Sequence, residues 1–151
     1  MTARAISALA YASDAVSGAA PALLAVRQLR LSDFRNYRQL RLDCGPEPVV
    51  LVGANGAGKT NLLEALSFLA PGRGLRRARL DEICRRRVGN ADDASATPPA
   101  ATSWAVAATL DTPDGRVAIG TGLEPPRSAG GLPRRVVRID GRPVPSQTAL
   151  G

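Results

Sequence analysis

The chain has 151 residues, 44% of them hydrophobic, which allows one folded domain with a moderate core. Its net charge of +7 favours a polyanionic partner such as nucleic acid, and the absence of histidine removes the commonest metal ligand and acid–base group. No apolar run is long enough to span a membrane, so we expect a cytoplasmic protein. Cys44 and Cys84 lie far apart in the sequence and are expected to be free thiols.

Residues 1–22 are rich in alanine and serine and match no targeting signal. A secretory signal needs an unbroken apolar stretch, and a mitochondrial presequence needs more arginine than the single Arg4 and no Asp14. We therefore expect a disordered N-terminal extension over residues 1–22, followed by the domain over residues 23–151.

Two strands are predicted between Leu23 and Asp43. Leucines alternate with polar residues at positions 29 and 31 and again at 40 and 42, which indicates one apolar and one polar face. Between them, residues 32–37 predict a polar turn with two aromatic side chains. We expect this antiparallel pair to lie beside a nucleotide-binding sheet.

The next segment fits the Walker A pattern G-x-x-x-x-G-K-[ST]. Its glycines let successive backbone N–H groups face one point, and the positive end of the following helix faces the same point. In this pattern the lysine contacts the β- and γ-phosphates and the Thr60 hydroxyl binds Mg²⁺. The predicted phosphate site consists of Gly53, Ala54, Asn55, Gly56, Ala57, Gly58, Lys59 and Thr60.

The segments on either side of this loop agree with a P-loop. Residues 48–52 form a short, apolar, β-branched run typical of a buried parallel strand. Residues 61–70 have apolar side chains at helical spacing, and Pro71 and Gly72 end the predicted helix. Lys59 is also the only lysine among 20 basic residues. A glycine-rich turn with an incidental lysine would need none of these features.

Residues 71–87 are dense in arginine, with only two acidic residues. One interpretation is a surface that contacts nucleic-acid phosphates; the other is a solvated loop and short helix in an arginine-rich chain. The segment has no aromatic residue, which argues against a platform for stacking single-stranded bases. Both interpretations remain open for Arg73, Arg76, Arg77, Arg79, Arg85, Arg86 and Arg87.

The last third of the chain predicts a loop and further strands. Residues 88–102 are small and polar, as in a surface loop. Two alternating segments, 104–110 and 116–120, surround the turn sequence Thr-Pro-Asp-Gly at 112–115 and predict a β-hairpin. A final strand is expected from Arg134 to Asp140.

Three motifs occur in order and at close spacing: LSDFRNY from Leu31, GANGAGKTNLLEA from Gly53, and PGRGLR from Pro71. Together with the later IDGR from Ile139, they resemble the N-terminal part of the RecF family, bacterial DNA replication and repair ATPases related to SMC-type and ABC-type heads. The resemblance covers residues 24–151. It implies an α/β fold, namely part of a P-loop NTPase head lobe of the ABC/SMC type with antiparallel flanking strands.

The resemblance implies an ATP-binding and DNA-binding protein of DNA replication, recombinational repair and the SOS response. Such a protein would bind single-stranded or gapped DNA and assist recombinase loading together with recombination mediator proteins. The full-length family is expected to form an ATP-dependent homodimer with the nucleotide between two protomers. Carried over by position, residues 53–60 are the phosphate site, and Arg35 and Asn36 match a turn close to the nucleotide in related heads.

The chain departs from the family pattern in two ways, and the second bears on catalysis. The N-terminal extension precedes the usual start of such proteins, and the Q-loop, signature motif, Walker B aspartate and catalytic carboxylate of such heads would follow residue 151. No apolar run in the chain ends in paired acidic residues. We therefore interpret the chain as an N-terminal fragment or truncated chain, assign no catalytic residue, and predict ATP binding without turnover, whereas full-length members are expected to be weak ATPases.

Two other function classes remain open. A small P-loop kinase or phosphotransferase would need an arginine-bearing lid, which residues 73–87 could supply, but such kinases favour parallel β/α repeats. A non-catalytic nucleic-acid-binding module would use the arginine surface alone. Binding of ATP, of a nucleoside acceptor or of DNA separates the three classes.

Overall fold

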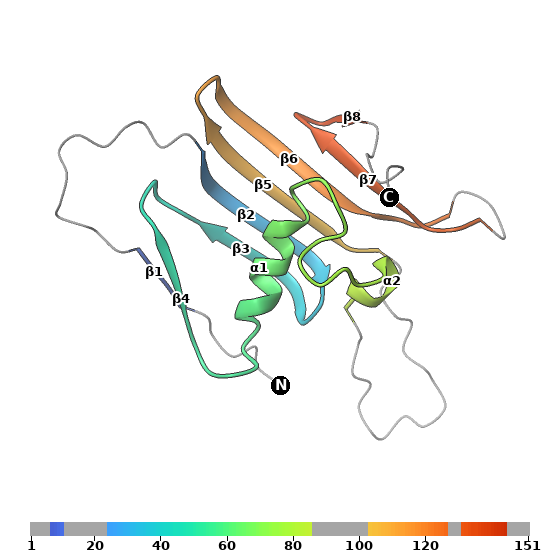
Figure 1. Ribbon diagram of the computed structural model, residues 1–151, viewed down its shortest axis with the longest axis horizontal. Coiled ribbons are helices and arrows are strands. Elements are labelled where there is room, and N and C mark those ends of the chain that lie inside the picture. The colour runs from blue at the N-terminus through green and yellow to red at the C-terminus, as the bar shows by residue number, and fades with distance from the viewer. Residues whose placement is uncertain (1–6, 11–23, 86–102, 127–130, 145–151) are drawn as a thin grey trace.

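The computed structural model describes residues 7–10, 24–85, 103–126 and 131–144. Its main body is a six-stranded sheet with strand order β3-β2-β5-β6-β7-β8, in which every neighbouring pair is antiparallel. Two helices, α1 and the single-turn α2, lie on one face of this sheet (Figure 1). The elements of this body are β2 (Ala25–Phe34), β3 (Tyr37–Asp43), α1 (Lys59–Ser67), α2 (Leu80–Ile83), β5 (Ala105–Thr112), β6 (Gly115–Glu124), β7 (Arg134–Ile139) and β8 (Arg142–Val144).

Strands β2 and β3 confirm the predicted pair, but the turn between them is shorter than expected. Leu29 and Leu31 are buried against the helices, as their alternation predicts. The turn was predicted over residues 32–37, yet β2 continues to Phe34 and β3 already begins at Tyr37. The fully buried Phe34 pairs with Tyr37 across the ladder, so the two aromatic residues belong to the strands and not to the turn.

The second hairpin is confirmed and a short strand was missed. Strands β5 and β6 pair from Thr112↔Gly115 onward, at the predicted turn. The last predicted strand ends one residue early, at Ile139, and the chain then turns back to form β8. Strand β8 is only three residues long and contains Pro143, so it carries too little alternation to be read from sequence. The predicted loop 88–102 lies outside the described residues.

The core lies between the sheet and α1 and is built around three aromatic rings. Phe34 and Trp104 have ring centroids 5.6 Å apart, and Phe68 lies 6.0 Å from Phe34 and 5.2 Å from Trp104. The first two pairs meet edge-on, a favoured arrangement for aromatic side chains. The indole N–H of Trp104 donates to the Leu80 carbonyl (2.9 Å), so its polar group is satisfied at the start of α2.

Arg135 ties β7 to the end of α1. Its guanidinium donates to the carbonyl oxygens of Phe68 (2.5 Å) and Gly72, and it lies 5.2 Å above the centre of the Phe68 ring. These carbonyls belong to the last turn of the helix and the segment after it, where an α-helix leaves acceptors without intrahelical donors. Burial lowers the pKa of Arg135 from its ordinary value. The contact holds the start of the arginine-dense segment against the sheet.

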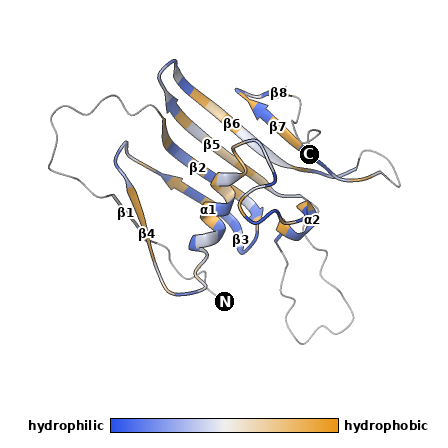
Figure 2. Cartoon of the chain, viewed as in Figure 1, coloured by the Kyte–Doolittle hydropathy of each residue, from blue (hydrophilic) through white to orange (hydrophobic). Residues whose placement is uncertain are grey.

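The strand before the P-loop differs most from expectation. Residues 48–52 were predicted to form a buried parallel strand, whereas β4 (Val49–Val52) pairs antiparallel with β1 (Ser7–Ala10) in a separate two-stranded sheet. Val50 is 52% exposed and Val52 46% exposed. The prediction of burial was wrong for the valines of this apolar strand (Figure 2), and of its residues only Leu51 packs against the core. Strand β1 takes four residues of the predicted extension; the rest of residues 1–22 lies outside the described ranges.

The helix after the P-loop is confirmed with shifted ends. It was predicted over residues 61–70 and spans Lys59–Ser67, with Leu62 and Ala65 buried as their spacing predicts. Neither described helix is long and apolar enough to cross a membrane.

Two glycines of β6 provide a matched test of how closely the sheet is packed. A Cβ built on Gly122 would lie 2.6 Å from the Trp104 carbonyl oxygen, whereas one on Gly120 would meet no atom closer than 3.9 Å. Gly122→Ala is therefore expected to lower the free energy of unfolding by about 1–3 kcal/mol through overpacking. Gly120→Ala should leave it unchanged or raise it by up to about 1 kcal/mol, because alanine restricts the unfolded chain. Urea unfolding of both variants checks this, and equal effects would contradict the packing.

Candidate functional site: a phosphate-binding loop held by a buried ion pair

The predicted Walker A residues connect β4 to α1, the strand–loop–helix context that a P-loop requires. Gly56 and Gly58 have φ angles of 79° and 110°, which residues with a Cβ rarely adopt. The Ala57 N–H donates to the Ala54 carbonyl (3.1 Å) and closes a tight turn. Ala57 and Gly58 are buried and residues 53–56 are exposed, so the loop rests on the protein at its helix side and is open at the other.

Helix α1 presents its N-terminal end to this loop. It begins at Lys59, with Gly58 in a left-handed conformation at the N-cap, and its first turn contains no acidic residue. The first N–H groups of an α-helix have no intrahelical acceptor, and the helix macrodipole makes this end positive. The loop and the helix end therefore form a suitable site for an anion such as phosphate.

Two side chains assigned to the nucleotide lie at this end. Lys59 Nζ donates to the carbonyl oxygens of Gly53 (2.6 Å) and Ala54 (3.0 Å), which holds the ammonium against the loop. An ammonium has three N–H groups, so one remains for a phosphate oxygen. Thr60 is exposed on the first turn of α1.

A buried ion pair fixes α1 to the turn between β2 and β3. Arg35 donates from Nε and Nη2 to the two carboxylate oxygens of Glu64, at 3.0 and 2.7 Å, and from Nη1 to the Glu82 carbonyl at 3.0 Å. Glu64 is fully buried. The resemblance placed Arg35 close to the nucleotide; in the structure its guanidinium binds Glu64 and the α2 backbone. Planar, two-pronged pairing of this kind is what arginine and carboxylate groups favour.

The next two residues, Asn36 of the turn and Tyr37 at the start of β3, lie against the P-loop. Asn36 Nδ2 donates to the Ala57 carbonyl (3.3 Å), and Asn36 Oδ1 accepts from Asn61 Nδ2 (2.9 Å). The Tyr37 hydroxyl is buried beside Gly58, and it has no hydrogen-bond partner among the described residues. Burial raises the pKa of Tyr37, so the hydroxyl stays protonated at neutral pH.

The arginine-dense segment divides into paired and unpaired side chains. Arg76 donates to Asn61 Oδ1 (3.2 Å) and lies 3.5 Å from the Glu64 carboxylate, so it belongs to the network under the P-loop. Arg79 pairs with Asp81, and Arg85 with Asp33. The exposed Arg73 and Arg77 make no ion pair within the described part of the chain. Arg86 and Arg87 lie outside the described residues.

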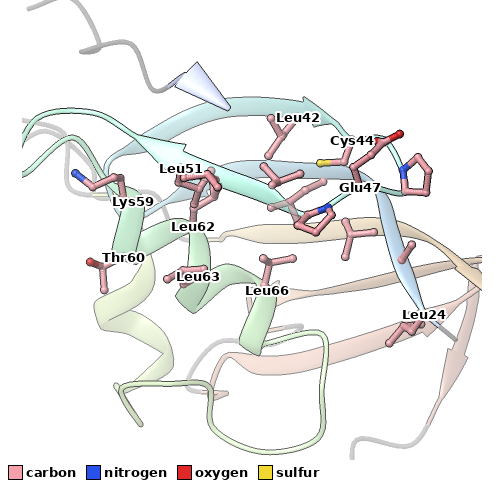
Figure 3. Close-up of a pocket in the computed structure, with 18 residues that line it drawn as sticks. Leu24, Leu42, Cys44, Glu47, Leu51, Lys59, Thr60, Leu62, Leu63 and Leu66 are labelled. Atoms are coloured by element: carbon pink, nitrogen blue, oxygen red, sulfur yellow. The ribbon is translucent and has the colours of Figure 1, made fainter. Parts of the chain in front are cut away.

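An apolar cavity of about 810 Å³ lies between β4, α1 and the β2–β3 pair (Figure 3). Leu51, Leu62 and Leu66 line its middle, while Lys59 and Thr60 stand at one end, with the Lys59 ammonium pointing away from it. Its lining omits the backbone of residues 53–58. Of the Walker A residues, only Lys59 and Thr60 therefore border the cavity.

Sequence reasoning did not identify Glu64, Asn61 and Arg76 as parts of this site. All three lie inside two of the motifs that carry the family resemblance, GANGAGKTNLLEA and PGRGLR. A carboxylate beside buried apolar residues of a helix signals a buried cationic partner. Cys44 and Cys84 are free thiols, as expected, and burial raises the pKa of both.

The family model described as the RecF/RecN/SMC N-terminal domain matches residues 25–121 of the chain. The protein named DNA replication and repair protein RecF is 48% identical over 122 residues in Caulobacter vibrioides and 46% identical over 127 residues in Agrobacterium fabrum. These alignments cover 80% and 84% of this chain but 28% and 30% of the relatives, so the chain spans less than a third of their length.

A solved structure described as the recombination mediator protein RecF-ATP in the RecFOR pathway has a similar fold. Its TM-score is 0.57 at 21% identity, over 82% of this chain and 29% of that chain. The likeness confirms the predicted fold class: part of a P-loop ATPase head of the ABC/SMC type, with antiparallel strands beside the P-loop.

The Glu64–Arg35 pair predicts a large difference between a buried and an exposed carboxylate. Glu64→Ala leaves the Arg35 guanidinium poorly solvated and without its partner, so the free energy of unfolding should fall by about 3–5 kcal/mol. Asp81→Ala, which breaks the exposed pair with Arg79, should cost about 0–1 kcal/mol. Chemical unfolding of the two variants measures both values. Similar losses would show that the Glu64 carboxylate contributes no more than a surface charge.

Proposed function

Because the chain belongs to the RecF/RecN/SMC N-terminal domain family, we propose that it binds ATP at residues 53–60 and acts in DNA replication and recombinational repair. The observation that carries the proposal is the P-loop between β4 and α1, with Gly56 and Gly58 at positive φ angles that residues with a Cβ rarely adopt. The relatives named for DNA replication and repair, and the RecF-ATP structure, support the choice of nucleotide and process.

The residues of the loop suit a triphosphate and its metal ion. Backbone N–H groups of Gly53, Ala54, Asn55, Gly56 and Gly58, together with the first turn of α1, would donate to phosphate oxygens, while the Ala57 N–H closes the turn on the Ala54 carbonyl. The third N–H of Lys59 would reach the β- and γ-phosphates, and the Thr60 hydroxyl would bind Mg²⁺. Phosphate oxygens and water molecules would complete the octahedral Mg²⁺ shell.

Binding without turnover is part of the same proposal. Hydrolysis of ATP in P-loop enzymes needs a group that orients the attacking water and further charge stabilisation of the transferred phosphoryl. The carboxylate of Glu64, which lies on α1 itself, is buried and bound to Arg35 and Arg76. It is therefore committed to holding the loop and is unavailable to water.

DNA is the partner proposed for the exposed arginines. The chain carries a net charge of +7, and Arg73 and Arg77 are exposed next to the P-loop helix. Single-stranded or gapped DNA, recombinase loading with recombination mediator proteins, an ATP-dependent homodimer, an SOS role and a cytoplasmic location belong to the proposal through the family resemblance. The names of the relatives support its coarser part, DNA replication and repair and a recombination mediator pathway. The antiparallel sheet disfavours the alternative of a small P-loop kinase, whose strands would be parallel.

Removal of the single lysine tests nucleotide binding. Lys59→Ala should weaken Mg·ATP binding about 10- to 100-fold, because a charge-assisted hydrogen bond to phosphate is lost. Lys59→Arg should fail as well, since the planar guanidinium is larger than the ammonium that the loop encloses. Arg116→Ala removes the same charge from the β5–β6 hairpin and serves as the control. Calorimetric titration measures all three, and unchanged affinity for Lys59→Ala would exclude this phosphate site.

Salt dependence tests the DNA-binding surface. Replacing Arg73 and Arg77 together by glutamine should lower the slope of log K against log salt by about two, because two phosphate contacts are lost. The matched control replaces Arg41 and Arg116, exposed arginines already paired with Asp43 and Asp111. Fluorescence anisotropy with a labelled gapped duplex measures both slopes. Equal slopes for the two double variants would assign residues 73–77 to a solvated loop.

A further inference from the structure

The turn between β2 and β3 makes a side-chain hydrogen bond to the P-loop backbone. Asn36 Nδ2 donates to the Ala57 carbonyl at 3.3 Å. The side chains of Asn36 and Tyr37 also lie close to Gly58. A Cβ built on Gly58 would lie 2.6 Å from Asn36 Nδ2 and 2.6 Å from the Tyr37 hydroxyl. Gly58 is therefore required at this position both by its φ of 110° and by the contact with this turn.

The direction of this hydrogen bond fixes the next donor of the loop. The Ala57 carbonyl and the Gly58 N–H belong to one planar peptide group, which is trans, so they point in opposite directions. Asn36 holds the carbonyl towards the β2–β3 turn. The Gly58 N–H then points away from the β2–β3 turn.

The Asn36 amide is itself oriented by its neighbours. Its Oδ1 accepts from Asn61 Nδ2 at 2.9 Å, and Asn61 Oδ1 accepts from Arg76 Nη1 at 3.2 Å. Rotating the Asn36 amide by 180° would place two oxygens together at Ala57 and two NH₂ groups together at Asn61. The preceding residue, Arg35, is held by Glu64. The network therefore allows one orientation, with the donor facing the P-loop.

We propose that Asn36 is a positioning residue of the phosphate site. It acts through the Ala57–Gly58 peptide and aims the Gly58 N–H at a phosphate oxygen without contacting the nucleotide itself. The proposal rests on the proposed function, since it concerns how the same loop binds phosphate. The turn between β2 and β3 thus orients the P-loop backbone through Asn36, in addition to binding α1 through the Arg35–Glu64 pair.

Tyr37 provides the matched control. Its hydroxyl lies as close to the Gly58 Cβ position as the Asn36 amide does, yet it makes no hydrogen bond in the described structure. Tyr37→Phe therefore removes a polar atom from the same contact without releasing the Ala57 carbonyl. A role that depends only on packing against Gly58 would respond to both changes, whereas a role in peptide orientation responds to Asn36 alone.

The test titrates Mg·ADP and inorganic pyrophosphate into the full 151-residue chain and records the ¹H–¹⁵N signal of Gly58. Asn36→Ala should weaken both ligands equally, by about five- to tenfold, the worth of one neutral hydrogen bond. It should also shift the Gly58 amide signal in the ligand-free chain. Tyr37→Phe should bind both ligands within about twofold of the parent and leave that signal in place.

The outcomes separate this inference from the proposed function. If the parent binds both ligands and Asn36→Ala binds them equally well, the positioning role is wrong and the phosphate site stands. If the parent binds neither, the proposed function is wrong, and an unchanged Gly58 signal in ligand-free Asn36→Ala then overturns the inference too. Should Asn36→Ala fail to fold, Asn36→Asp keeps the shape and replaces the donor by an acceptor, and the same Gly58 signal decides.

Discussion

The buried carboxylate of Glu64 is the group to which the parts around the P-loop are tied. A carboxylate without water needs a cation and several donors close by, or burial would cost more than the fold gains. Arg35 supplies two hydrogen bonds from the β2–β3 turn, and Arg76 approaches from the loop after α1. One negative charge thereby holds the β2–β3 turn, α1 and the loop after α1 in a single arrangement beside the P-loop.

Much of the fold could be read from the sequence because its elements carry local signals. Alternation marks β2, β3, β5 and β6, and the Walker A pattern marks the loop between β4 and α1. The rest of the fold depends on which segments pack against each other, and sequence periodicity does not predict this. The carboxylate of Glu64 could have faced solvent on a nine-residue helix, and the apolar run of β4 reads as buried whether or not another element covers it. The hydrogen bond from Asn36 to the Ala57 carbonyl corresponds to no pattern in the sequence.

Arginine serves two physical roles in this chain. Arg35 and Arg135 are internal: their planar groups satisfy a carboxylate and the carbonyls at the end of α1, respectively, and Arg135 also lies over an aromatic ring. Such roles use the five donors and the weak hydration of the guanidinium. Other arginines are exposed and paired with single acids, or unpaired. Composition counts all of them as one positive charge each, so it overstates the charge available to a polyanion.

The confinement of the only lysine to the P-loop has a practical consequence. The chain offers an amine-selective reagent two targets, the N-terminus and Lys59 Nζ, and the second is held by two loop carbonyls. Acylation would thus install a single internal reporter at the P-loop. A lysine-specific protease would likewise have one internal cleavage point, after residue 59, where α1 begins. The rate of that single cut would report how often the loop and the first turn of the helix open.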